Sequence, residues 1–212
     1  MRLSCTESRE QRGRRREARH AATVRRVGCG DTVGVGWCRC ASEEPESSAV
    51  PDAIRGYLSR TPGAHFSKLR DDLRLGTGET QHHLRALESE GAVESRRDGD
   101  YRRFYPAGQF SAFEQTTLGY LRRETARGVL VTLLRESEPT GADVARALDV
   151  SRATVSNHVG QLETAGLLDR SDGYRVRQPE TVVVLLVRYA DSFGPDAVAF
   201  ADEVPELLRY GG

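Results

Sequence analysis

Three polar side chains between positions 152 and 157 have the chemistry and the spacing to read the edges of nucleic-acid bases. Arg152 presents a planar set of donors that suits guanine or a phosphate, Asn157 suits adenine, and Ser156 suits either group. If this stretch is helical, these residues share its outer face with Ala153, while apolar residues at i, i+4 and i+7 face inward. The alternative interpretation of the same pattern is an ordinary solvated helix face.

The elements that must position these residues lie between positions 140 and 179. Thr140 and Asp143 have the spacing of a capping box and predict the start of a short helix. Asp149–Ser151 then predicts a turn, and Gly166 predicts the end of a second helix. Asp172-Gly173 is typical of a hairpin turn between two short strands. This succession is the layout of a winged helix-turn-helix, in which the second helix lies in the major groove.

The run SRATVSNHVGQLETAGLL, residues 151–168, resembles the recognition helix of ArsR- and MarR-type transcription regulators. The resemblance extends over residues 140–179. It implies contacts to DNA from the helix and from the wing that follows it. The residues expected to make these contacts are Arg152, Ala153, Ser156, Asn157, His158, Arg175 and Arg177.

An internal repeat organises the chain. A shift of 75 residues places Ser67–Glu94 on Ala142–Asp169 without a gap, and apolar, glycine and histidine positions coincide, including His83 with His158. The sequence therefore predicts a mainly α protein with small β wings: two tandem winged helix-turn-helix domains joined by a helix, with further helices at the C-terminus. The resemblance is to a tandem, archaeal form of these regulators.

The first copy of the repeat differs from the second in its candidate contacts. Its recognition helix and its wing are expected to touch DNA through Thr77, Gln81, His82, Arg85, Arg96, Arg97, Arg102 and Arg103. Glu79, near the start of that helix, would repel the DNA backbone unless it accepts from cytosine. The alternative for the wing is an exposed hairpin whose aromatic residues pack inward and whose arginines are only solvated.

The paired histidines favour a structural or phosphate-contacting role over metal binding. His83 and His158 occupy matched positions beside the inward stripe of each helix. His82 and His83 are neighbours, and neighbouring residues of a helix point about 100° apart, so the two cannot easily chelate one ion.

Residues 1–48 differ from the rest of the chain. They contain ten arginines, all four cysteines and the only tryptophan, without helical or strand periodicity. We expect this segment to be disordered. The alternatives are a basic arm on phosphates, a metal site using Cys29, Cys38 and Cys40, or upstream sequence translated from a misplaced start, with Val50 as the true first residue. The cysteines lack paired Cys-x-x-Cys spacing, and we expect no metal and no cofactor.

The remaining segments predict helices. Ser111 and Glu114 form a second capping box and open a helix expected to run to Arg135, and its charged cluster at 122–127 is interpreted as a solvated face. Thr181–Ala190 is the most apolar run, expected as a helix that pairs two copies of the chain. Pro195–Leu208 is expected to form one or two short helices interrupted at Pro205. The predicted segments are 1–48, 49–109, 110–179 and 180–212, the last serving homodimerisation.

Composition narrows the function classes. The 212 residues carry no net charge, and Lys68 is the only lysine, a bias typical of a GC-rich genome that indicates a salt-adapted archaeon or an actinobacterium. No apolar run reaches the ~18 residues that a membrane span requires, and no secretion signal is visible, so a cytoplasmic protein is expected. Glycine-rich phosphate loops, nucleophile elbows and His-Glu-x-x-His pairs are all absent from the sequence, so we do not expect an enzyme.

These observations favour a sequence-specific transcription regulator that binds double-stranded DNA, and we expect it to be a homodimer. The competing interpretation is a protein-interaction adaptor of the chromosome-segregation or polymerase-associated type, without base readout. Residues 49–212 hold 21 basic and 24 acidic residues, and this slight acidity keeps the adaptor interpretation open. A third hypothesis is a sensor with a pocket for an unknown small-molecule effector at the junction of the two domains.

Overall fold

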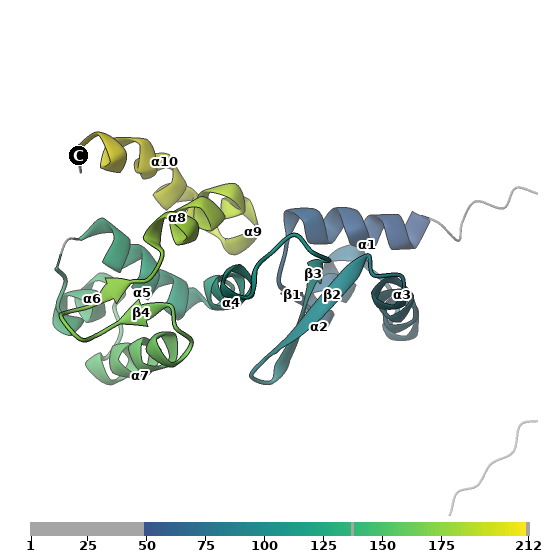
Figure 1. Cartoon of the computed structure of the whole chain (residues 1–212), viewed down its shortest axis with the longest axis horizontal. Coiled ribbons are helices and arrows are strands. Elements are labelled where there is room, and N and C mark those ends of the chain that lie inside the picture. Colours follow the sequence, from purple (N-terminus) through teal and green to yellow (C-terminus); the bar gives the residue numbers. More distant parts are fainter. Residues whose placement is uncertain (1–48, 137, 211–212) are drawn as a thin grey trace, which may run out of the picture. The chain divides into compact units, whose positions relative to one another are not determined.

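The structure is a computed structural model that describes residues 49–136 and 138–210 (Figure 1). The first half of the described chain contains α1 (Ala49–Arg60), β1 (Ala64–His65), α2 (Phe66–Leu73), α3 (Thr77–Ser89), β2 (Val93–Asp98) and β3 (Tyr101–Pro106). The second half contains α4 (Ala112–Leu121), α5 (Glu124–Arg135), α6 (Gly141–Ala147), α7 (Arg152–Thr164), β4 (Leu168–Asp169), β5 (Arg175–Val176), α8 (Pro179–Arg188), α9 (Ala190–Phe193) and α10 (Pro195–Tyr210).

The first winged domain is built on the apolar face of α1. Ile54 and Leu58 of this helix are fully buried, and they pack with Leu69 of α2, Leu84 of α3 and Phe104 of β3 in one core. The sheet has the strand order β1-β3-β2, with antiparallel pairing throughout. The long hairpin of β2 and β3 is the wing of this domain (Figure 1).

The second winged domain repeats the first, and its first and third helices keep the same boundaries. A shift of 75 residues carries Ala49–Arg60 onto Glu124–Arg135, and Thr77–Ser89 onto Arg152–Thr164. The turn that precedes each recognition helix also holds a residue in the left-handed region, Arg74 at φ 55° and Asp149 at φ 52°. The predicted fold class, two tandem winged helix-turn-helix domains with C-terminal helices, is confirmed.

The connection between the two domains differs from the prediction. The expected continuous helix from Ser111 to Arg135 is divided into α4 and α5, because Arg123 is extended, at φ −100° and ψ 114°. A straight helix of that length would extend for about 36 Å. The break instead lets Leu118 and Leu121 of α4 share a core with α5. The capping box at Ser111 is present, since Ser111 N–H donates to Glu114 at 2.7 Å.

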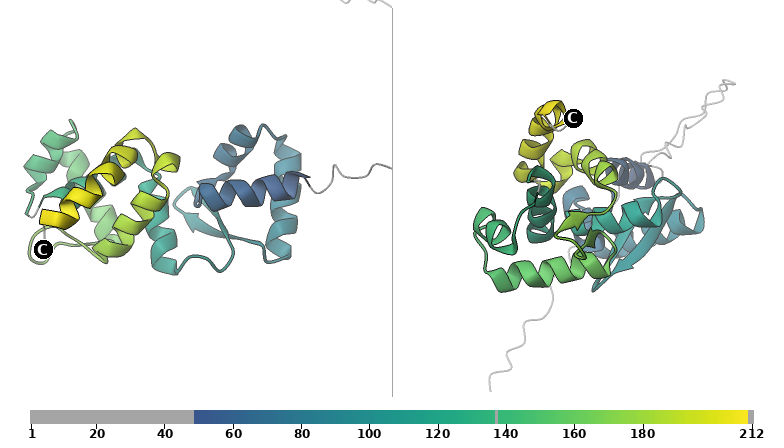
Figure 2. Two further views of the ribbon diagram at one scale, coloured as in Figure 1. Left: turned by 90° about the horizontal axis from the view of Figure 1, so that it is seen from above. Right: turned by 60° about the vertical axis from the view of Figure 1, so that its left-hand side comes forward.

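The C-terminal helices pack on the second winged domain (Figure 2). Val182, Leu185 and Leu186 of α8 are buried in the same core as α4, α5 and α7. The apolar run is therefore a helix, as expected. The expected interruption at Pro205 is wrong, because α10 continues through it.

Among the described residues, no helix is both long and apolar enough to span a lipid bilayer. The hypotheses for residues 1–48, namely disorder, a basic arm, a cysteine metal site and a misplaced start, lie outside the described residues.

Candidate nucleic-acid interface

Helix α7 separates a buried anchoring face from an exposed polar face. Val155, Val159 and Leu162 are at most 1% exposed and fix the helix on the core of the second winged domain. Arg152, Ala153, Ser156 and Asn157 are exposed on the opposite side. The side chains of Arg152, Ser156 and Asn157 form no hydrogen bond or ion pair with other described residues, so their donors and acceptors remain available.

Local hydrogen bonds fix where α7 begins. Ser151 accepts from the N–H of Thr154 at 3.0 Å and caps the helix, as its sequence position predicts. The preceding helix α6 begins with a capping box. The N–H of Asp143 donates to the Thr140 hydroxyl, and the N–H of Thr140 donates to the Asp143 carboxylate. The turn between α6 and α7 is locked because Val150 N–H donates to Ala145 at 3.0 Å. The exposed face of α7 is therefore presented by a rigid frame.

The second wing is short and carries loosely paired arginines. Arg175 lies 3.7 Å from Asp172, and Arg177 lies 3.7 Å from Asp169, and both arginine side chains are largely exposed. Ion pairs of this kind contribute little to stability, on the order of 0–1 kcal/mol. Both guanidinium groups can therefore exchange their carboxylate for a phosphate at small cost.

The first recognition helix, α3, is anchored in the same way. Thr80, Leu84 and Leu87 are buried. The predicted contact residues Thr77, Gln81, His82 and Arg85 are all exposed. Glu79 has a local role, because its carboxylate accepts from the N–H of Gly76 at 3.2 Å and so caps the helix.

The first wing divides its four arginines between two faces. Arg97 lies opposite Arg102 in the β2–β3 register, whereas Arg96 lies opposite Arg103 on the other face. The exposed Arg102 donates to Glu88 at 2.7 Å and to Ser95 Oγ at 2.8 Å, and the exposed Arg97 donates to the carbonyl of Gly99. Arg96 donates to the carbonyl of Ala112 at 2.6 Å and thereby links the wing to α4.

The expected DNA contact by Arg103 is wrong. Its side chain is 4% exposed, and its guanidinium donates to the carboxylate of Asp98 and to the carbonyl of Gly63. A group held in this way cannot reach a phosphate. The sequence shows four arginines of similar appearance, and only the contacts with Asp98 and Gly63 reveal that this one is internal.

Two family models match the chain in succession. Residues 48–118 match a model described as an N-terminal HTH domain, and residues 124–177 match the model of the MarR family. The chain is therefore a tandem of two winged helix-turn-helix domains, the second similar to the MarR family.

A curated relative gives the same result. The chain is 27% identical over 124 residues to an uncharacterized HTH-type transcriptional regulator of Methanocaldococcus jannaschii. The match covers 58% of this chain but only 31% of that relative. The chain thus spans about a third of the length of the relative, and the resemblance to MarR-like winged-helix regulators is confirmed.

His158 of the MarR-like domain is only partly available. Its Nδ1 atom is buried without a hydrogen-bond partner among the described residues. Burial, and next the charge of Arg123, lower the pKa of this imidazole. The side chain is therefore neutral at pH 7, which favours packing over a charged contact to a phosphate.

The prediction of a solvated face for the charged cluster at 122–127 is wrong for two of its arginines, Arg122 and Arg127. Arg127 is 4% exposed and forms a bidentate pair with Asp196 of α10, at 2.7 and 2.8 Å. Arg122 donates to the carbonyl of Pro62 and to Ser192. Their partners lie 60 to 70 residues away in sequence, and no local pattern indicates them.

Proposed function

We propose that the chain is a DNA-binding transcription regulator that reads base sequence through α7. The observation that supports the proposal is an exposed face of this helix whose polar side chains have no partner among the described residues. Arg152, Ser156 and Asn157 are exposed and unbonded within the described chain, while the opposite face is anchored at 1% exposure or less. A rigid helix with free donors and acceptors is what major-groove readout requires.

The two wings supply phosphate contacts in this proposal. Arg175 and Arg177 of the second wing, and Arg97 of the first, have exposed guanidinium groups with weak partners. Arg102 is exposed too, but Glu88 and Ser95 hold its guanidinium, and a phosphate would have to replace Glu88. Such contacts position a protein on DNA without reading sequence. The exposed Thr77, Gln81, His82 and Arg85 give α3 the means for a second set of contacts.

Homodimerisation through residues 180–212 is part of the proposal, but the apolar surface that could pair two copies is smaller than the sequence predicts. Most of the apolar run of α8 is covered by its own chain. Val184 and Val187 are 59% and 42% exposed, and they lie one helical turn apart on α8. Sedimentation of the full chain tests this: a Val184→Glu, Val187→Glu variant should be monomeric where the parent is dimeric. A monomeric parent would contradict dimerisation, and a variant that remains dimeric would contradict dimerisation through this face of α8.

A genomic DNA selection tests the proposed function. The full chain and an Arg152→Ala, Asn157→Ala variant are each incubated with fragmented DNA at moderate and high salt, and bound fragments are sequenced. Enrichment of one short sequence by the parent, lost in the variant while salt-sensitive background binding persists, supports a sequence-reading regulator. No enrichment by the parent at any salt would reject it in favour of the protein-interaction adaptor.

A further inference from the structure

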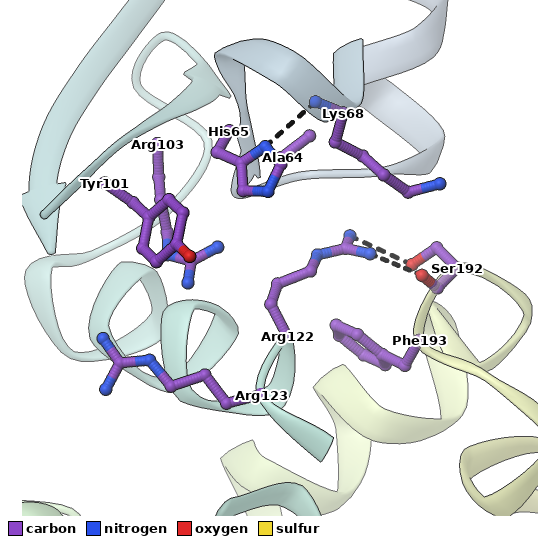
Figure 3. Close-up of a pocket in the computed structure, with 9 residues that line it drawn as sticks. All are labelled: Ala64, His65, Lys68, Tyr101, Arg103, Arg122, Arg123, Ser192 and Phe193. Atoms are coloured by element: carbon purple, nitrogen blue, oxygen red, sulfur yellow. Dashed lines mark hydrogen bonds between the residues drawn. The ribbon is translucent and has the colours of Figure 1, made fainter. Parts of the chain in front are cut away.

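A basic cavity lies away from both recognition helices. It has a volume of about 240 Å³ and is lined by α2, β1, the first wing, the α4–α5 junction and α9 (Figure 3). No residue of α3 or α7 lines it. Five of its nine lining residues are basic: His65, Lys68, Arg103, Arg122 and Arg123.

The cations around the cavity outnumber their counter-charges. Asp98 pairs with both Arg103 and Arg123, and Asp72 pairs with Lys68. Two carboxylates therefore serve four permanent cations, and neither carboxylate lines the cavity. The cavity keeps an excess positive charge, which would attract an anion.

Arg122 is the cation left without a carboxylate among the described residues. Its guanidinium donates to the carbonyl of Pro62 at 2.8 Å, and to the carbonyl and hydroxyl oxygens of Ser192. Burial lowers its pKa to about 10, so the group still carries its charge at pH 7. The hydrogen-bond acceptors of this guanidinium are all uncharged, and a buried charge without a direct ion pair is costly, so an oxyanion beside it would reduce that cost.

Aromatic rings complete the walls and limit the size of an occupant. The rings of His65 and Tyr101 are stacked at 5.1 Å and 15°, and the Arg122 guanidinium lies 4.6 Å from the centre of the Phe193 ring. The volume is below the roughly 300–1,000 Å³ of pockets for drug-sized ligands. Cationic side chains and flat aromatic rings in the same lining suit a small, flat molecule that carries an oxyanion.

We propose that this cavity binds a small oxyanion, carried by a carboxylate or a phosphate. Arg122 links Pro62, which precedes the first wing, to Ser192 of α9. An occupant beside Arg122 would therefore touch both the first winged domain and the C-terminal helices. A phosphate within duplex DNA is a poorer fit, because Arg122 lies beside Ser192 and Phe193 in a cavity that no residue of α7 lines (Figure 3). Its guanidinium is also bonded to the carbonyl of Pro62.

Calorimetric titration of the full chain tests the proposal. The probes are inorganic phosphate and benzoate, each at matched ionic strength in chloride buffer, and no DNA is present. We expect saturable binding of at least one probe with one site per chain. Preference for phosphate or benzoate identifies which oxyanion the site takes. No saturable binding tighter than about 1 mM with either probe would overturn the proposal.

Matched variants locate the site. Lys68 and Arg146 each form an exposed ion pair with a helix carboxylate, but only Lys68 lines the cavity. Lys68→Gln should weaken binding at least tenfold, and Arg146→Gln should leave it within twofold. Arg122→Lys keeps the charge but loses the planar fork, and it too should weaken binding. If the Arg122→Lys variant does not fold, the comparison of Lys68→Gln with Arg146→Gln still tests the site.

The remaining outcomes separate this proposal from the proposed function. Equal weakening by Lys68→Gln and Arg146→Gln would mean that general charge attracts the anion, and it would overturn the site. Loss of DNA affinity in Lys68→Gln, without anion binding by the parent, would assign the cavity to the DNA backbone instead. Because the titration contains no DNA, saturable anion binding would stand even if no DNA sequence were selected.

Discussion

Asp98, at the tip of the first wing, accepts hydrogen bonds from both Arg103 in the adjacent strand and Arg123 at the α4–α5 junction. This carboxylate joins the wing to the segment that connects the two winged domains. It also explains why Arg103 is buried although it lies in a hairpin rich in exposed arginines.

Removal of Asp98 should be costly. In Asp98→Asn the Arg103 guanidinium, with its side chain 4% exposed, loses its counter-charge. Breaking a buried pair by removing one partner costs about 3–5 kcal/mol, and we expect about 3 kcal/mol because Asp98 is 20% exposed. Urea unfolding measures the loss. Asp172→Asn, which removes an exposed partner 3.7 Å from Arg175, is the control and should change stability by less than about 0.5 kcal/mol. Equal losses in both variants would contradict the structural role of Asp98.

Two helical glycines should respond in opposite directions to alanine. A Cβ at Gly160 in α7 would meet no atom within 4 Å, so Gly160→Ala should stabilise the protein by about 0.5–1 kcal/mol through helix propensity. A Cβ at Gly119 in α4 would lie 3.0 Å from the Asp98 carboxylate, which two arginines hold in place. Gly119→Ala should therefore destabilise the protein, and thermal unfolding of both variants checks the sign. Stabilisation by Gly119→Ala would show that Asp98 can move away from the new methyl group at little cost.

The pair of Arg127 and Asp196 should make the free energy of unfolding depend on pH in the acidic range. Burial alone would raise the pKa of the Asp196 carboxyl, but hydrogen bonds and charge from Arg127 outweigh it and lower the pKa below 3.8. The stabilising contribution is therefore complete above the unfolded-state pKa and is lost as the pH falls through the folded-state pKa. Between about pH 5 and pH 2 the free energy of unfolding should fall more steeply for the parent than for Asp196→Asn. Parallel curves would contradict the pairing.

His158 should add a second pH dependence in a higher range. Because burial and Arg123 lower its pKa from 6.5, the unfolded chain takes up a proton at this histidine more readily than the folded chain does. Stability is therefore complete above pH 6.5 and declines as the pH falls toward the folded-state pKa. Urea titrations between about pH 8 and pH 5 should show a decline in the parent that is reduced in His158→Gln. A decline of the same size in both would place the effect elsewhere.

Much of the fold was predictable because the repeat carries its own signals. Capping residues at Thr140 and Ser151, helix-ending glycines and apolar spacing specify the helices locally. The same signals placed Arg152, Ser156 and Asn157 on the exposed face of α7, where the structure has them.

The rest depended on contacts between residues distant in sequence. Strand β1 is two residues long, and it exists because Ala64 and His65 pair with β3. Arg103, Arg122 and Arg127 look like surface arginines until the fold brings Asp98, Pro62 and Asp196 to them. The basic cavity arises from the same distant contacts, so residue types and spacing could not reveal it.

The most direct test of base readout by α7 compares two single variants on two duplexes. Fluorescence polarisation measures binding of the parent, Arg152→Ala and Arg177→Ala to the selected sequence and to a permuted one, over a range of salt concentrations. Arg152→Ala should lose about 1–3 kcal/mol on the selected duplex alone, so the ratio between the duplexes falls. Arg177→Ala should weaken both equally and reduce the salt slope by about 1. If Arg152→Ala weakens both duplexes equally, or neither, α7 does not read sequence and the central claim is wrong.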